Sequence, residues 1–270
     1  MGIYIDGRVG NELREMLSCR GGWDGITVED VHSCTQMHYL GKEPIEKAAE
    51  FFNLHVENPH RVLDFGAGFA GDSRVLAARY GCHVSCVDIQ PHVHDTAEKL
   101  TRELKMEDRV SHVCIDSEQV IPGAPFDHML SILVILHIPN RPEAFSRVAT
   151  ALKPSATIFI EDFFKRNEFS DSELQDLATT VACPGPLPSK EQYIQELTEA
   201  GFCDIQFEEM HDRWLPFLIE RKKIFTSEMA RHERVHGTKM TEELLHFYST
   251  VLRIFEDGNL GGARICARKA

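Results

Sequence analysis

The stretch Arg61-Val-Leu-Asp-Phe-Gly-Ala-Gly-Phe-Ala-Gly-Asp72 decides the fold class of this chain. Its first five residues are typical of a short buried strand, and its three glycines of a tight turn. Residues 73–80 are expected to form a helix that ends at Gly81. A strand, a glycine turn and a helix in this order bind nucleotide-type ligands in open α/β sheets.

The glycines alone do not identify that ligand. The spacing Gly66-x-Gly68-x-x-Gly71 also fits the dinucleotide fingerprint. Asp64, two residues before the first glycine, argues against a dinucleotide, because a carboxylate there repels a pyrophosphate by roughly 1 to 4 kcal/mol at contact distance. S-adenosylmethionine carries an ammonium and a sulfonium instead, and a carboxylate attracts both. The stretch therefore favours S-adenosylmethionine as the ligand.

Two further carboxylates follow the next predicted strands. Residues 83–88 end in Asp88, which we expect to accept hydrogen bonds from two ribose hydroxyls. Residues 109–116 end in Asp116, which we expect to accept from an adenine amino group, with Ser117 beside it. An acid in this position also fits a dinucleotide, so Asp88 alone does not discriminate. Three acids at the ends of successive strands support one ligand site.

Strands and helices alternate through the middle of the chain, which predicts an α/β, doubly wound, Rossmann-like sheet. After residue 164 two shorter helices and a sixth strand follow, and then two long helical stretches before a last strand. The expected strands after the third are residues 126–135, 156–164, 204–210 and 260–269, and the expected helices are 43–54, 91–107, 142–152, 171–182, 189–200, 214–236 and 241–256.

This pattern predicts a division of the chain into three parts. Residues 1–42 are expected to form an N-terminal arm over the active site, although a flexible tail is the alternative for the first thirty. Residues 43–212 and 258–270 are expected to form the ligand-binding core. Residues 213–257 are expected to form a helical cap, with a dimerisation layer as the alternative.

Composition limits the partners. The chain has 270 residues, a net charge of −13 and eight cysteines without a CxxC pair. An acidic chain disfavours a nucleic-acid substrate, which basic patches bind. Without a long apolar span or an N-terminal signal-type run, we expect a cytoplasmic protein that does not insert into membranes and is a monomer or homodimer.

With these motifs in place, the chain resembles class I S-adenosylmethionine-dependent methyltransferases. It is most similar to the group of phosphoethanolamine, sarcosine/dimethylglycine and sterol methyltransferases. The resemblance implies a seven-stranded sheet with an antiparallel last strand. It also implies methyl transfer to a nitrogen of a small amine or amino acid, leaving S-adenosylhomocysteine. Carbon or oxygen methylation of an apolar molecule such as a sterol or quinone is the alternative.

The resemblance also implies roles for individual residues. His137 falls where phosphoethanolamine methyltransferases carry a catalytic histidine, and its intrinsic pKa suits a base near neutral pH. Asp162 is a candidate to hold an amine, or else a carboxylate that caps a loop. The remaining expected substrate contacts are Trp23, His38, Phe163 and Trp214, and the remaining expected cofactor contacts are Tyr39, Leu40, Ala67, Ile89 and Ser131.

One motif supports a remote alternative. The stretch His232-Glu-Arg-Val-His236 matches H-E-x-x-H, which on a helix can bind zinc and supply a hydrolytic base through its glutamate, Glu233. Arg231 and Arg234 would place cations beside the metal, and no third ligand stands out. We therefore expect no metal site.

Overall fold

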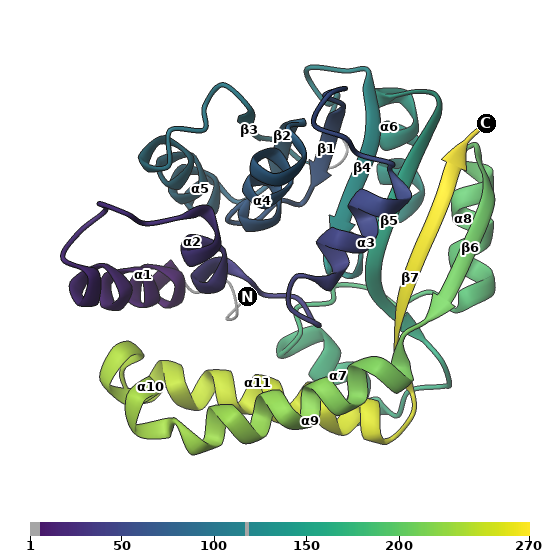
Figure 1. The fold of residues 1–270 in the computed structure, drawn as a ribbon. Coiled ribbons are helices and arrows are strands. Elements are labelled where there is room, and N and C mark those ends of the chain that lie inside the picture. Colours follow the sequence, from purple (N-terminus) through teal and green to yellow (C-terminus); the bar gives the residue numbers. More distant parts are fainter. Residues whose placement is uncertain (1–5, 117–118) are drawn as a thin grey trace.

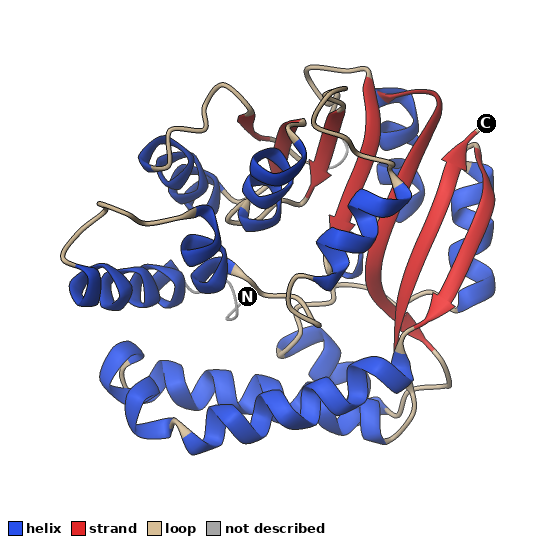
Figure 2. Ribbon diagram, viewed as in Figure 1, coloured by secondary structure: helices blue, strands red, loops and turns tan. Residues whose placement is uncertain are grey.

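The computed structural model describes residues 6–116 and 119–270, and its centre is a seven-stranded sheet (Figures 1 and 2). The strand order is β3-β2-β1-β4-β5-β7-β6. Neighbours are parallel except at β7, which is antiparallel to both β5 and β6. This confirms the predicted sheet. Its strands are Arg61–Phe65, His83–Asp88, Val110–Cys114, Phe126–Ile132, Leu152–Lys165, Phe202–Glu209 and Leu260–Lys269.

Helices cover both faces of the sheet, because the central strands are apolar on both sides. On β1, Val62 faces one buried core and Leu63 the other, as the alternation of a strand requires. The first core packs against α3 (Glu43–Phe51), α4 (Gly71–Tyr80) and α5 (Pro91–Glu103). The second packs against α6 (Arg141–Ala151) and α8 (Lys190–Glu199).

The N-terminal region is helical, although it is polar and rich in glycine. It forms α1 (Asp6–Arg20) and α2 (Val28–Thr35), and a capping box between Thr27 and Asp30 begins the second helix. Val9 and Leu13 of α1 pack with Val93 of α5 in a small apolar cluster. The region is therefore anchored to the core, and a flexible tail is the wrong interpretation for its described residues.

A second helical layer lies at the edge where the parallel strands finish (Figure 1). It contains α7 (Asp171–Thr179), α9 (His211–Ser227), α10 (Met229–His236) and α11 (Thr238–Glu256). The single helix expected over residues 214–236 is two helices, which meet at Glu228. Among the described residues, the structure contains no helix with the length and hydropathy needed to cross a membrane.

The predicted fourth strand is too long. Strand β4 ends at Ile132, Leu133 takes a positive φ of 55°, and a short 3-10 helix, η1 (Ile135–His137), follows. The apolar run continues past the strand because Leu133 and Leu136 line a cavity instead of the sheet core. Side chains are apolar both in the sheet core and in the cavity wall, so the apolar run could not show where the strand ends.

Candidate methyl-transfer site

A cavity of about 930 Å³, including the open space at its mouth, lies at the carboxyl ends of β1 and β4. Three parts of the chain form most of its wall: the glycine turn after β1, the segment between α2 and α3, and the turn after β4. The described lining residues are Thr35, Gln36, Met37, His38, Tyr39, Asp64, Gly66, Ala67, Gly68, Phe69, Gly71, Asp72, Ile132, Leu133, Leu136, His137, Phe163, Val181 and Phe247.

The glycine turn is shaped by close contacts that only glycine allows. Gly66 has a φ of +81°, and a Cβ there would lie 2.2 Å from Val134 Cγ1. A Cβ on Gly71 would meet the Thr35 hydroxyl. The backbone nitrogens of Gly66 and Ala67 both donate to the Val87 carbonyl, at 2.8 and 3.0 Å. The turn is thus tied to β2 and exposes its backbone to the cavity.

Asp64 brings a buried carboxylate to the wall of this cavity. It accepts a hydrogen bond from the Ser73 hydroxyl, and it forms no ion pair with a Lys or Arg among the described residues. Burial, together with the nearby carboxylates of Asp72 and Asp88, raises the pKa of Asp64 from 3.8 to about 7. A cationic ligand would stabilise its ionised form, and an anionic ligand would be repelled.

Asp72, in contrast, already contacts two histidines. Its Oδ1 lies 2.8 Å from His32 Nε2 and 3.0 Å from His38 Nε2. His38 Nδ1 also lies 3.0 Å from the Tyr39 carbonyl oxygen. Because both partners of His38 can only accept, this geometry favours the form of the ring with protons on both nitrogens, which is the cation. Burial opposes this charge, but the Asp72 carboxylate outweighs it and raises the pKa of His38.

His137 reaches the same cavity from the turn after β4. Its Nδ1 lies 2.9 Å from the Ala182 carbonyl oxygen, which can only accept a hydrogen bond. In the neutral ring Nδ1 therefore carries the proton and Nε2 carries the basic lone pair. Burial lowers the pKa of His137, with the Ala182 bond acting in the opposite direction. The lowered pKa favours the neutral ring, which is the form that can accept a proton.

The comparisons with known proteins agree with this geometry. A family model described as a methyltransferase domain matches residues 36–206. This chain belongs to the methyltransferase domain family. It is 30% identical over 203 residues to glycine/sarcosine/dimethylglycine N-methyltransferase of Actinopolyspora halophila, covering 74% of this chain and 35% of the relative. It is 28% identical over 205 residues to phosphoethanolamine N-methyltransferase 1 of Zea mays, covering 72% and 40%.

The fold of this methyltransferase domain has a close match among solved structures. Phosphoethanolamine N-methyltransferase 2 of Haemonchus contortus, in complex with phosphomonomethylethanolamine and S-adenosylhomocysteine, aligns with a TM-score of 0.78. The identity is 22%, and the alignment covers 87% of this chain and 54% of that one. The chain spans 35% and 40% of the length of the two curated relatives above. The cofactor of the family is S-adenosylmethionine.

The residues of the cavity fit that cofactor. Asp64 is a buried carboxylate without a Lys or Arg partner among the described residues, and its charge is stabilised by an ammonium or sulfonium. None of the described lining residues is Lys or Arg, so the wall offers no such cation to a pyrophosphate. S-adenosylmethionine supplies a methyl carbon activated by its sulfonium, and Asp64 with the glycine turn would hold it.

Eight of the predicted site residues line the cavity. These are His38, Tyr39, Asp64, Gly66, Ala67, Gly68, His137 and Phe163. Asp88 lies one step behind the wall, where it accepts from the backbone nitrogen of Gly68 at 2.8 Å. Asp116 and Ile89 are exposed at the ends of the neighbouring strands, and Ser117 lies outside the described residues. The ligand roles of all these residues stay predictions.

The other predicted contacts do not line the cavity. Asp162 is fully buried, and Oδ2 accepts from the backbone nitrogens of Val134 and Leu136, each at 3.2 Å, so it caps the turn that carries His137. The Ser131 hydroxyl donates to the Phe65 carbonyl within the sheet. Trp214 is packed in the core of the helical layer. Trp23 packs beside α1, and Leu40 packs beside the helical layer.

Several lining residues were missed. Asp72 directly follows the glycine turn, so its position in the motif could have singled it out. Gln36 and Met37 belong to the segment that already contained His38 and Tyr39. Val181 and Phe247 come from the loop after α7 and from α11, and no local pattern distinguishes them from core residues.

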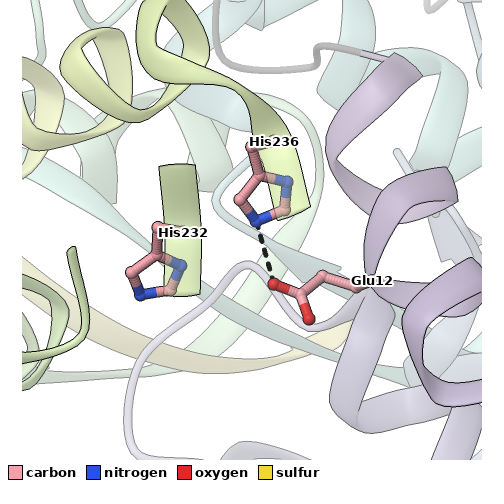
Figure 3. Close-up of side chains that lie close together, drawn as sticks. All are labelled: Glu12, His232 and His236. Atoms are coloured by element: carbon pink, nitrogen blue, oxygen red, sulfur yellow. Dashed lines mark hydrogen bonds and ion pairs between the residues drawn. The ribbon is translucent and has the colours of Figure 1, made fainter. Parts of the chain in front are cut away.

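The H-E-x-x-H motif lies outside this cavity. His232 and His236 of α10 face Glu12 of α1, and His236 Nε2 lies 2.9 Å from Glu12 Oε1 (Figure 3). The three side chains bring their ligand atoms within 4.8 Å of one another and could hold a metal ion, as could His32, His38 and Asp72. Arg231 also donates to Glu12 Oε2, at 2.6 Å, which places a cation beside the carboxylate that would bind the metal.

Proposed function

We propose that this protein transfers a methyl group from S-adenosylmethionine to a nitrogen of a small metabolite, an amine or an amino acid. His137 carries the proposal, because its bond to Ala182 presents Nε2 as the basic nitrogen in the cavity that also contains Asp64. The named activities of the two curated relatives support nitrogen as the acceptor atom.

His137 would act by removing the proton that an ammonium acceptor must lose before it attacks. Its lowered pKa keeps the ring neutral and ready to accept. Asp162 would position this base through its bonds to the turn before it. The helical layer of α9, α10 and α11, which we propose as the cap predicted over residues 213–257, would exclude water during transfer.

A second candidate is carbon or oxygen methylation of an apolar molecule. Ile132, Leu133, Leu136, Phe163, Val181 and Phe247 give the cavity a large apolar wall, which a sterol-like or quinone-like acceptor would fill. Zinc-dependent hydrolysis stays a remote third, since its motif lies at the α1–α10 contact. A cytoplasmic location and a monomeric or homodimeric state also stay predictions.

The first experiment is calorimetric titration of the protein with S-adenosylmethionine, S-adenosylhomocysteine, NAD and zinc in parallel. We expect the two adenosyl ligands to bind and to raise the thermal midpoint by mass action, and NAD to do neither. An acceptor screen with glycine, sarcosine, dimethylglycine, phosphoethanolamine and a quinol would follow. Binding of NAD in place of both adenosyl ligands would overturn the proposal.

A further inference from the structure

A second cavity adjoins the first on the side of the helical layer. It encloses about 770 Å³, again including open space, and shares Gln36, Met37 and Phe247 with the methyl-transfer cavity. Its other walls come from α1, α2, Gly41, α9 and α11. A molecule whose nucleophile reaches the first cavity past these shared residues would place its far end in the second.

Two arginines line this second cavity, and neither forms an ion pair with a carboxylate in the part of the chain that the structure describes. Arg221 donates to the His38 carbonyl, and Arg8 to the Met37 sulfur at 3.1 Å. No Asp or Glu is found among the described residues of the cavity wall. The two guanidinium groups are also close enough for the charge of Arg8 to help burial lower the pKa of Arg221.

This arrangement is unusual for such an acidic chain. The sequence has 42 Asp and Glu against 29 Lys and Arg. Arg213, two turns earlier on α9, and Arg231 on α10 each contact a glutamate. Two neighbouring cations without a carboxylate cost free energy unless an anion joins them. Paired guanidinium groups bind carboxylate or phosphate oxygens particularly well.

The rest of the wall suits an apolar body. Arg221 stacks on the rings of Phe217 and Tyr39, with its guanidinium carbon 4.6 and 4.9 Å from their centroids. Phe247 and Leu244 add further apolar surface. The stacking holds the Arg221 group in a fixed plane and leaves its remaining N–H groups to a ligand.

We propose that this second cavity binds the anionic group of the methyl acceptor, so that the acceptor is an organic acid with an apolar or aromatic body. The inference rests on the proposed methyl transfer and names its substrate class. The two cavities are then complementary in charge to their ligands. Asp64 would face the cationic donor, and Arg8 with Arg221 would face the acid.

The test compares acids with matched alcohols on the protein saturated with S-adenosylhomocysteine. The probes are 3-phenylpropionate with 3-phenylpropanol, octanoate with octanol, and phenyl phosphate, titrated by calorimetry. We expect each acid to bind about tenfold or more tightly than its alcohol, since one charge-assisted hydrogen bond is worth that ratio. Comparing phenyl phosphate with 3-phenylpropionate shows whether the cavity prefers a phosphate or a carboxylate.

Variants assign the effect to the arginines. Arg8→Gln and Arg221→Gln should each remove the preference for acids. Two control variants make the same change of charge: Arg14→Gln on the helix of Arg8, and Lys223→Gln on the helix of Arg221. Both should keep the preference for acids. Arg221→Lys retains a cation and should keep a weaker preference, even if Arg221→Gln disturbs the His38 segment.

Failure of this inference is distinct from failure of the proposed function. If S-adenosylhomocysteine binds but acids and alcohols bind equally, or if acid preference survives both glutamine variants, the anion site is overturned and methyl transfer stands. If S-adenosylhomocysteine does not bind, methyl transfer falls, and the acid comparison repeated on the ligand-free protein still tests the cavity. No binding of any acid at millimolar concentration would also overturn the site.

Discussion

His137 shows how one backbone contact sets the chemistry of a side chain. The Ala182 carbonyl selects the tautomer, and Ala182 itself holds a positive φ of 60° in the loop after α7. Asp162 fixes the other side by binding the backbone just before the histidine. His137 is therefore held by two residues that do not line the cavity themselves.

Replacing His137 by asparagine separates these two roles. The asparagine amide can occupy the place of Nδ1 and still donate to Ala182, but it lacks a basic nitrogen. We expect kcat to fall by roughly 10² to 10⁴, as for loss of a general base. Calorimetry should show little change in S-adenosylhomocysteine affinity. A variant with the kcat of the unmodified protein would exclude His137 as the base.

We expect Asp64 to make cofactor affinity depend on pH. Burial raises its pKa from 3.8 to about 7, so its contribution to stability is present below about pH 4 and is lost as the pH rises through 7. A cationic ligand requires the ionised form. Affinity for S-adenosylmethionine should therefore weaken as the pH falls below 7, by at most about tenfold per pH unit.

Two substitutions test this assignment by calorimetry across pH 5 to 8. Asp64→Asn should flatten the pH dependence and weaken binding throughout, while making the ligand-free protein more stable at high pH. Asp162 also has a pKa raised to about 7 by burial, but it does not line the cavity. Asp162→Asn should change the pH dependence of stability and keep that of affinity. If Asp162→Asn flattened the pH dependence of affinity and Asp64→Asn left it unchanged, Asp64 would not be the residue that binds the cation.

At the scale of elements, the glycine turn joins β1 to α4 under tight steric limits. Gly66 approaches Val134 of the turn after β4, so two segments about seventy positions apart in sequence meet here. Gly68 also has a positive φ, of 53°, but a Cβ there would contact nothing within 4 Å. The two glycines thus share a backbone conformation and differ in packing.

This difference predicts unequal costs for alanine. Gly66→Ala should lower the free energy of unfolding by about 2 to 5 kcal/mol, because left-handed strain adds to overpacking. Gly68→Ala should cost about 1 to 2 kcal/mol from strain alone. Urea denaturation of the ligand-free protein measures both. Equal losses would mean that Val134 moves aside without cost.

Across the whole molecule, α1 and α10 are joined although more than two hundred residues separate them. Glu12 and Glu15 contact Arg231, and Glu12 also contacts His236 (Figure 3). Burial opposes ionisation of Glu12, but its bonds to His236 and Arg231 outweigh it and lower its pKa from 4.5 to about 2. Its stabilising effect is thus present above pH 4.5 and lost as the pH falls toward 2.

Breaking this contact should loosen both helices more than it destabilises the sheet. We expect Glu12→Gln to speed amide exchange in α1 and α10 at pH 7, with a global loss of about 1 kcal/mol or less for such a partly exposed network. The exposed Glu233 of α10 provides the control. Glu233→Gln should change neither the amide exchange of the two helices nor the global stability. Unchanged exchange in α1 would show that apolar packing alone holds it.

Much of the sheet was predictable because its signals are local. Apolar runs of strand length, a glycine turn and terminal acids all lie within a few residues of one another, as in residues 61–72. Element ends were less predictable. The break at Glu228 and the early end of β4 at Ile132 depend on what each segment packs against, and helix periodicity or hydrophobicity does not encode that.

The sequence by itself determined the class of sheet and the choice of a cationic over an anionic nucleotide-type ligand, because Asp64 and its glycines are neighbours along the chain. Only the tertiary structure decided which apolar residues face a cavity, why Asp162 caps a turn, and that Arg8 and Arg221 line one cavity. These outcomes depend on contacts between segments far apart in sequence. Folding of the chain sets the distances between such segments, and a local sequence pattern does not.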